Sequence, residues 1–272
     1  MKNLVLRTVT GVAFVAVMTA GILYSPNTMW LLFLAITALT TWEFTGLVNK
    51  QPGVRVIRPM AVSAAVLLYT AFSYMECDLP ESRLLLAPWL LCNILILAEE
   101  LYLGHNKPLD SWAYAMMAQI YIAVPFTLLT VMDDRLYVMA IFLFLWCNDS
   151  GAYCTGSLIG RHKLCPRVSP GKTWEGSIGG CVLAMACAAV MWHVSPAALT
   201  LPEWLGFALI TVVAGTVGDL VESLFKRKLG IKDSGNILPG HGGMLDRFDS
   251  SLLAIPAVAA YLFLLETLWS LL

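Results

Sequence analysis

Residues 203–228 read EWLGFALITVVAGTVGDLVESLFKRK, an apolar run that is interrupted near its end by Asp219 and Glu222 and closes on three consecutive cations. A membrane-spanning helix needs about 20 predominantly apolar residues, and this run supplies them. A carboxylate inside such a span costs at least a few kcal/mol, so its presence needs a reason. The stretch therefore predicts a transmembrane helix with polar chemistry at one end.

The same apolar pattern recurs along the whole chain. Of its 272 residues, 58% are hydrophobic and 13% are charged, against roughly 45–50% and a quarter in soluble domains. We therefore expect an all-α integral membrane protein, a polytopic bundle of about nine transmembrane helices. We expect one membrane domain over 1–272, with N-terminal helices in roughly 1–131 and a catalytic half in roughly 136–272. The predicted spans are 4–24, 28–48, 59–75, 84–103, 111–131, 136–157, 177–195, 203–224 and 249–271.

The basic residues predict how these spans are oriented. With the N-terminus inside, fifteen of the 17 Lys and Arg residues fall in inner segments, and only Arg83 and Arg135 fall outside. Cytoplasmic loops carry this excess of positive charge. An odd number of spans then places the C-terminus outside. We expect a multi-pass protein of a bacterial inner membrane.

Charge and cysteine content exclude several function classes. The formal net charge is −1, so no global field attracts nucleic acid, and we expect no nucleic-acid partner. The seven cysteines include no C-x-x-C pair, which argues against a zinc site or a disulfide framework.

Most acidic residues of the predicted spans share one depth, the cytoplasmic half of the bilayer. A polar chamber open to the cytoplasm would require this agreement, whereas scattered structural carboxylates would not. Glu99 and Glu100 read more simply as an interfacial helix end, and the role of Glu43 stays open. The residues of the group are Glu43, Glu99, Glu100, Asp149, Asp219, Glu222, Asp246 and Asp249.

The densest polar segment is 219–249. Asp219 and Ser223 are four residues apart and share one helix face, and Asp246 and Asp249 are predicted to share the face of the last span's first turn. Such oxygen donors suit Mg²⁺, which takes one or two carboxylates plus substrate phosphates. The adjacent Lys226 and Arg227 suit phosphate oxygens.

Two further features favour phosphate chemistry. Gly242 and Gly243 precede a predicted helix start, where backbone N–H groups can face an anion. The loop 161–176 is basic and contains Ser169, Lys172 and Thr173, and we expect Lys172 to contact a phosphate. A transporter or channel would also use intramembrane carboxylates, but the chain shows no internal repeat of the kind common in transporters.

Three motifs resemble those of one enzyme family. Residues 223–249, SLFKRKLGIKDSGNILPGHGGMLDRFD, are similar to the signature of the phosphatidate cytidylyltransferase (CDP-diacylglycerol synthase) family. Ser169–Gly176 and Asn148-Asp149 with Gly151–Tyr153 resemble two further motifs of that family. The matched regions cover the C-terminal half, and the first 130 residues resemble the family only in hydropathy and in Trp42-Glu43.

The resemblance implies transfer of CMP from CTP to phosphatidic acid, giving CDP-diacylglycerol and pyrophosphate in phospholipid biosynthesis. It also implies Mg²⁺, a second cation such as K⁺, contact with membrane lipids, and a homodimer. With the residue patterns, it predicts Asp219, Asp246 and Asp249 as metal ligands, and catalytic roles for Asp219, Asp246, Lys226, Arg227 and Lys172. The predicted substrate-binding residues are Ser223, Lys172, Thr173, Asp149, Lys226, Arg227, His241, Gly242, Gly243 and Arg247. The active site is expected to face the cytoplasm.

One alternative enzyme shares this chemistry. A CTP-dependent lipid or polyprenol kinase would transfer the γ-phosphoryl group and release CDP rather than pyrophosphate. The long signature argues against it, but the carboxylates and cations alone do not separate the two reactions.

Overall fold

A computed structural model describes residues 2–75, 84–104, 106–132, 134–235, 237 and 242–271. The chain divides into two compact units. The first comprises Met1–Asp133 and Leu229–Phe248, and the second comprises Asp134–Lys228 and Asp249–Leu272. The segment 229–248 therefore belongs with the N-terminal helices, although it joins two helices of the second unit.

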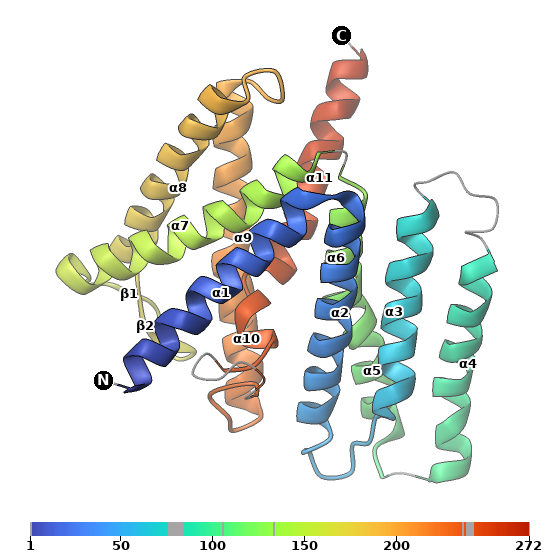
Figure 1. Ribbon diagram of the computed structural model, residues 1–272. Coiled ribbons are helices and arrows are strands. Elements are labelled where there is room, and N and C mark those ends of the chain that lie inside the picture. The colour runs from blue at the N-terminus through green and yellow to red at the C-terminus, as the bar shows by residue number, and fades with distance from the viewer. Residues whose placement is uncertain are drawn as a thin grey trace. The chain divides into compact units, whose positions relative to one another are not determined.

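The first unit is built from long apolar helices. They are α1 (Lys2–Tyr24), α2 (Pro26–Val48), α3 (Arg58–Met75), α4 (Leu86–Leu103), α5 (Pro108–Met117), α6 (Val124–Thr130) and the short α10 (Leu245–Phe248). Helix α3 packs between α2 and α4 (Figure 1). The sequence fixes the start of α2, because Ser25 and Thr28 form a capping box and Pro26 occupies its first turn.

A π-helical segment, η2 (Ala118–Ala123), joins α5 to α6 within the span predicted at 111–131. Pro125 lies two residues after the end of this segment, in the first turn of α6, and has no N–H to donate to the preceding turn. The missing donor gives a physical reason for the local change in hydrogen bonding.

Aromatic packing holds α10 in the first unit. The Phe248 ring lies 5.4 Å from that of Phe126 and 5.9 Å from that of Phe14, and Phe126 stacks on Phe33 at 5.8 Å. The prediction that Asp246 and Asp249 share one helix face is wrong. Asp246 lies in α10, whereas Asp249 lies in the turn before the next helix.

The second unit contains α7 (Arg135–Ile159), α8 (Trp174–Val194), α9 (Leu201–Lys228) and α11 (Ser251–Leu271). Helix α7 packs along α8, and α9 packs against both α8 and α11. Its aromatic core contains Phe144, which meets Trp204 and Phe207 edge to face, while the rings of Trp204 and Phe207 are tilted by 43° to each other.

A β-hairpin interrupts the helices of the second unit. Strand β1 (Lys163–Cys165) pairs antiparallel with β2 (Ser169–Thr173), with Lys163 opposite Thr173. The all-α prediction is therefore wrong at this point, because residues that read as a polar loop pair with each other.

Each of the nine predicted spans coincides with a helix or a continuous helical segment. Among the described residues, seven helices are long and apolar enough to cross a membrane, and α1 adds a shorter apolar stretch, Thr8–Tyr24. The chain is thus a multi-pass membrane protein by the length and composition of its helices. The count of nine and the orientation stay predictions.

Candidate active site

Glycines bring α7 and α8 into close contact. A Cβ added to Gly180 would lie 2.5 Å from the backbone oxygen of Asn148, and one added to Gly151 would lie 2.9 Å from the Cα of Gly180. Small residues let helix backbones approach in this way in membranes. Gly176 and Gly180, four residues apart on α8, both lie against the backbone of α7.

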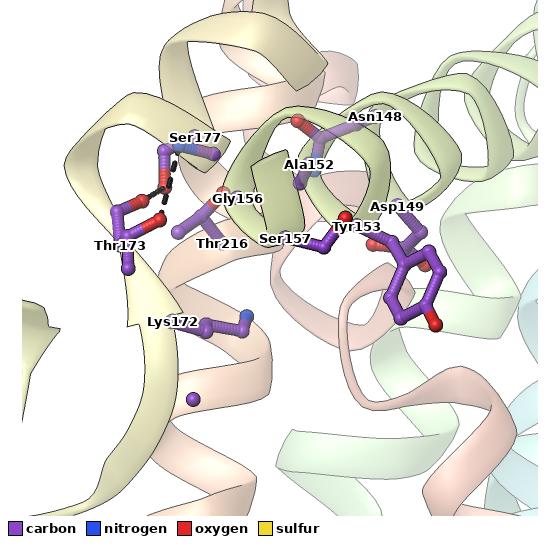
Figure 2. A pocket seen from close by; sticks show the side chains of 12 residues that line it. Asn148, Asp149, Ala152, Tyr153, Gly156, Ser157, Lys172, Thr173, Ser177 and Thr216 are labelled. Atoms are coloured by element: carbon purple, nitrogen blue, oxygen red, sulfur yellow. Dashed lines mark hydrogen bonds between the residues drawn. The ribbon is translucent and has the colours of Figure 1, made fainter. Parts of the chain in front are cut away.

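A cavity of about 440 Å³ opens beside this contact. Figure 2 shows that polar side chains of α7, the hairpin, α8 and α9 line it. The lining residues are Asn148, Asp149, Ala152, Tyr153, Gly156, Ser157, Gly171, Lys172, Thr173, Gly176, Ser177 and Thr216. Three of the predicted substrate-binding residues, Asp149, Lys172 and Thr173, are thus brought together.

Thr173 and Lys172, which both line this cavity, make different contacts. Thr173 is the N-cap of α8, where its hydroxyl accepts from the Gly176 N–H at 3.2 Å, and its side chain is buried. Lys172 extends from β2 to α9, where its Nζ lies 2.6 Å from the Oδ2 atom of Asp219. The hairpin therefore places a cation beside a carboxylate of α9.

The Glu175 carboxylate holds the hairpin against the start of α8. It accepts from the backbone N–H groups of Arg161 and His162 at 3.1–3.2 Å, and it lies 2.6 Å from the His162 Nδ1 atom. Glu175 sits in the first turn of α8, where negative charge is favourable. These contacts attach the residues just before β1 to the start of α8, and β1 pairs with β2, the strand that carries Lys172.

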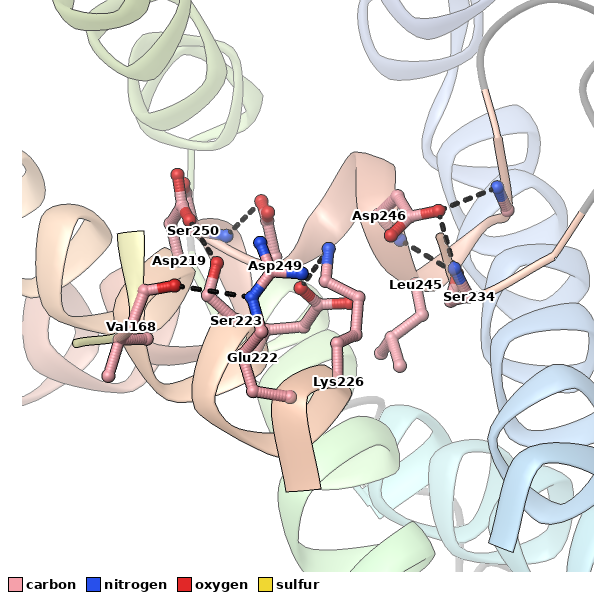
Figure 3. A network of polar contacts seen from close by, with 12 residues as sticks. Val168, Asp219, Glu222, Ser223, Lys226, Ser234, Leu245, Asp246, Asp249 and Ser250 are labelled. Carbon is pink, nitrogen blue, oxygen red and sulfur yellow. Dashed lines mark hydrogen bonds and ion pairs between the residues drawn. The ribbon is translucent and has the colours of Figure 1, made fainter. Parts of the chain in front are cut away.

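Asp219 and Ser223 share a helix face, as predicted. The Ser223 hydroxyl donates to the Oδ1 atom of Asp219 at 3.1 Å (Figure 3). Asp249 lies within electrostatic range of Asp219, Asp149 and Lys226. The second unit therefore gathers three of the predicted carboxylates in one neighbourhood.

The two predicted cations of α9 have protein partners. The Lys226 Nζ lies 2.5 Å from the Oε2 atom of Glu222, whose side chain is fully buried. The Arg227 Nε donates to the Val168 carbonyl in the hairpin at 3.4 Å. Lys226 thus compensates a buried charge, and Arg227 joins α9 to the loop between β1 and β2.

In the first unit, the Asp246 carboxylate organises its own segment. Its Oδ2 atom accepts from the backbone N–H groups of Ser234 and Gly243, both at 2.9 Å (Figure 3). Gly242 adopts a φ of +84°, a conformation that glycine tolerates. The Gly243 N–H, predicted to face a bound anion, faces a carboxylate of the chain itself.

Two further predicted residues are Arg247 and His241. Arg247 is exposed on α10. His241 lies outside the described residues, so its predicted role is neither supported nor opposed. Ser177 and Thr216 were not predicted, although Thr216 is three residues before Asp219 and hence on the same helix face.

The donor set of the second unit fits a hard divalent cation in part. Asp219 and Asp249 offer carboxylate oxygens, and the Lys172 ammonium shows that Asp219 accepts a cationic partner. In the part of the chain that the structure describes, no three His, Cys, Asp or Glu side chains converge on one point, so no site made of three or more such protein ligands is seen there. Mg²⁺ with one or two protein carboxylates, completed by water and phosphate oxygens, is consistent with this arrangement.

Comparison with known proteins gives the chain its family. It matches the cytidylyltransferase family over residues 5–265. The chain belongs to this family. It is 34% identical to the phosphatidate cytidylyltransferase of Haemophilus influenzae, in an alignment that covers 97% of this chain and 99% of the relative.

Two shorter matches agree with this assignment. The phosphatidate cytidylyltransferase of Staphylococcus haemolyticus is 44% identical over 146 residues, 53% of this chain and 56% of the relative. That of Staphylococcus aureus strain COL is 42% identical over the same shares of the two chains. The resemblance found in the sequence motifs is therefore confirmed, and the protein is a nucleotidyltransferase-family enzyme.

Proposed function

We propose that this chain is a phosphatidate cytidylyltransferase, which transfers CMP from CTP to phosphatidic acid and releases pyrophosphate. The observation that carries the proposal is the full-length match to a relative of that name. The Lys172–Asp219 pair beside a polar cavity supports it. A lysine ammonium can bind phosphate oxygens, and an aspartate carboxylate can bind a divalent cation.

The reaction joins two anionic substrates. An oxygen of the phosphatidate phosphate attacks the α-phosphorus of CTP, the bond from that phosphorus to the oxygen bridging to the β-phosphate breaks, and pyrophosphate leaves with the electron pair. The nucleophile is already ionised near neutral pH, so no strong general base is needed. Catalysis of such transfers depends mostly on positioning and on charge stabilisation.

The chain's own residues supply these two requirements. Lys172, and Arg227 beside the hairpin, would hold phosphate oxygens, while Ser223 keeps the Asp219 carboxylate oriented. Asp219 and Asp249 would hold Mg²⁺. Mg²⁺, when bound, neutralises triphosphate charge. Asp246 as a further ligand, K⁺ as a second cation and the homodimer remain proposals that follow from the family resemblance.

The cellular setting completes the proposal. The chain would lie in a bacterial inner membrane with its active site facing the cytoplasm, because CTP is cytosolic while the lipid stays in the leaflet. The excess of Lys and Arg in the predicted inner segments supports this orientation.

The test is product analysis with purified, detergent-solubilised protein, CTP, phosphatidic acid and Mg²⁺, with and without EDTA. The proposal predicts equal amounts of CDP-diacylglycerol and pyrophosphate, and loss of both with EDTA. Release of CDP with a phosphorylated lipid would instead identify a kinase. An absence of nucleotide turnover in a folded preparation would overturn the proposal and favour a transporter.

A further inference from the structure

A single carboxylate of the first unit binds the segment that carries Asp246. Glu43 lies on α2 and is only 7% exposed. Its Oε2 atom accepts from the Met244 N–H at 2.9 Å, and its Oε1 atom accepts from the Leu245 N–H at 3.1 Å. The Ser234 hydroxyl donates to the same Oε1 atom.

Ser234 connects this carboxylate to Asp246. The Ser234 hydroxyl, which donates to Glu43, accepts from the Asp246 N–H at 3.3 Å, and the Ser234 N–H donates to the Asp246 Oδ2 atom. The two acidic side chains thus share one bridging residue. A displacement of the Glu43 carboxylate would therefore reach Asp246 through one side chain.

Two glycines make room for the Glu43 side chain. A Cβ added to Gly235 would lie 2.5 Å from its Oε2 atom, and a Cβ added to Gly243 would overlap its Oε1 atom. The segment therefore closes around a carboxylate at close range. A lipid-facing or solvated glutamate would need neither the glycines nor three donors.

The burial of the Glu43 carboxylate ties its hydrogen bonds to the conformation of the segment 229–248. A buried carboxylate must be hydrogen-bonded, and hydrogen bonds to a charged group are roughly twice as strong as neutral ones. Here the Ser234 hydroxyl and the N–H groups of Met244 and Leu245 all come from the segment 229–248 rather than from α2 itself. The buried Glu43 carboxylate on α2 thus holds the backbone of the segment 229–248 in one conformation.

We infer that Glu43 is the positioning residue of the Gly242–Asp246 segment in nucleotidyl transfer. The inference rests on the proposed function, because that function includes Asp246 as a further proposed metal ligand. Glu43 acts on the segment through the N–H groups of Met244 and Leu245 and through Ser234, and it touches no reacting atom.

The test compares Glu43→Gln with Glu100→Gln. Glutamine replaces one acceptor oxygen by an NH₂ donor, which then opposes an N–H or O–H of the segment. Glu100, on α4 of the same unit, is as buried as Glu43, at 6% exposed, and lies outside the site, so it is a matched control. The readouts are kcat and KM per folded molecule, and amide hydrogen exchange of peptides spanning 242–248.

Glu43→Gln is expected to lower kcat by about 10–100-fold, the range typical of residues that orient a catalytic group. Exchange at Met244 and Leu245 should accelerate, while exchange in α3 should not change. Glu100→Gln should leave kcat and exchange at 242–248 unchanged. A merely stabilising Glu43 would lower the folded fraction only, and unchanged exchange at 242–248 would overturn the inference.

A second variant keeps the test decisive if Glu43→Gln does not fold. Ser234→Ala removes the bridging hydroxyl but leaves both carboxylates, so it should accelerate exchange at 242–248 with a smaller loss of kcat. The effects of Ser234→Ala and Glu43→Asp on kcat should be non-additive, because both act on one network. Additive effects would contradict the inference.

The failure of the proposed function and the failure of this inference give different results. An inactive wild type would contradict the proposed function. An active wild type with normal exchange in these variants would contradict only the role of Glu43.

Discussion

The Lys172 ammonium lies 2.6 Å from the Asp219 carboxylate and links the β-hairpin to α9 within the second unit. The two side chains are 28% and 25% exposed, so water screens the pair. Partly exposed ion pairs contribute about 0–1 kcal/mol to stability. The pair is therefore better explained by the chemistry of the cavity that Lys172 lines than by folding.

Lys172→Met should lower kcat/KM by about 10²–10³-fold, the cost of removing a donor that stabilises transition-state charge. The melting temperature in detergent should stay close to that of the wild type, because the ion pair adds little stability. The measurement is CTP-dependent formation of labelled lipid.

Lys163→Met is the matched control for this variant. Lys163 is an exposed lysine of strand β1 in the same hairpin, so the variant removes the same charge without touching the cavity. Equal losses in the two variants would show that only the general charge of the hairpin matters, and would exclude a specific role for Lys172.

Asp246→Asn should abolish turnover while the protein stays folded in membranes. An asparagine oxygen can still accept from the N–H groups of Ser234 and Gly243, so the variant removes the charge and keeps the local hydrogen bonds. Activity should therefore be lost, while amide exchange at 242–248 should stay close to that of the wild type. Full CTP-dependent activity in this variant would remove Asp246 from the site.

Glu222→Gln should destabilise the second unit by about 3–5 kcal/mol, the cost of breaking a buried ion pair at one partner. The Glu222 side chain is 0% exposed and Lys226 is 14% exposed, so little water compensates the remaining charge. The double variant Glu222→Gln with Lys226→Met should recover part of that loss in thermal unfolding. A double variant less stable than Glu222→Gln alone would contradict this account of the pair.

Gly180→Val should weaken the packing of α7 on α8. The added side chain would meet the Asn148 backbone, and overpacking of this kind typically costs about 1–3 kcal/mol. Gly171→Ala is the control for stability, because a Cβ there meets no atom within 4 Å. Thermal unfolding that ranks the two variants equally would refute the close-packing role.

The helices of this protein were largely predictable because hydropathy follows membrane thickness. Their ends were less so. Helix α9 continues to Lys228, beyond the span predicted to end at 224, since cations are favourable in the last turn of a helix. Helix α8 begins at Trp174 rather than 177, because Thr173 caps it. Polar residues extend helices past the apolar runs that indicate them.

Asp149, Lys172 and Thr173 of the candidate site could be named from the sequence, but their arrangement could not. Helical spacing was enough to place Ser223 on Asp219. Spacing could not show that Lys172 reaches Asp219, because the β1–β2 pairing that directs it is a tertiary contact. Nor could it show that Glu43 binds a segment about 200 residues away.

Parallel reactions with [α-³²P]CTP and [γ-³²P]CTP test the proposed reaction at the bond that breaks. The purified protein would be incubated with phosphatidic acid and Mg²⁺, and label would be counted in the lipid and aqueous fractions. Transfer of CMP predicts that α-label enters the lipid and that γ-label is recovered as pyrophosphate. Entry of γ-label into the lipid, or no label in the lipid from either nucleotide, would contradict it.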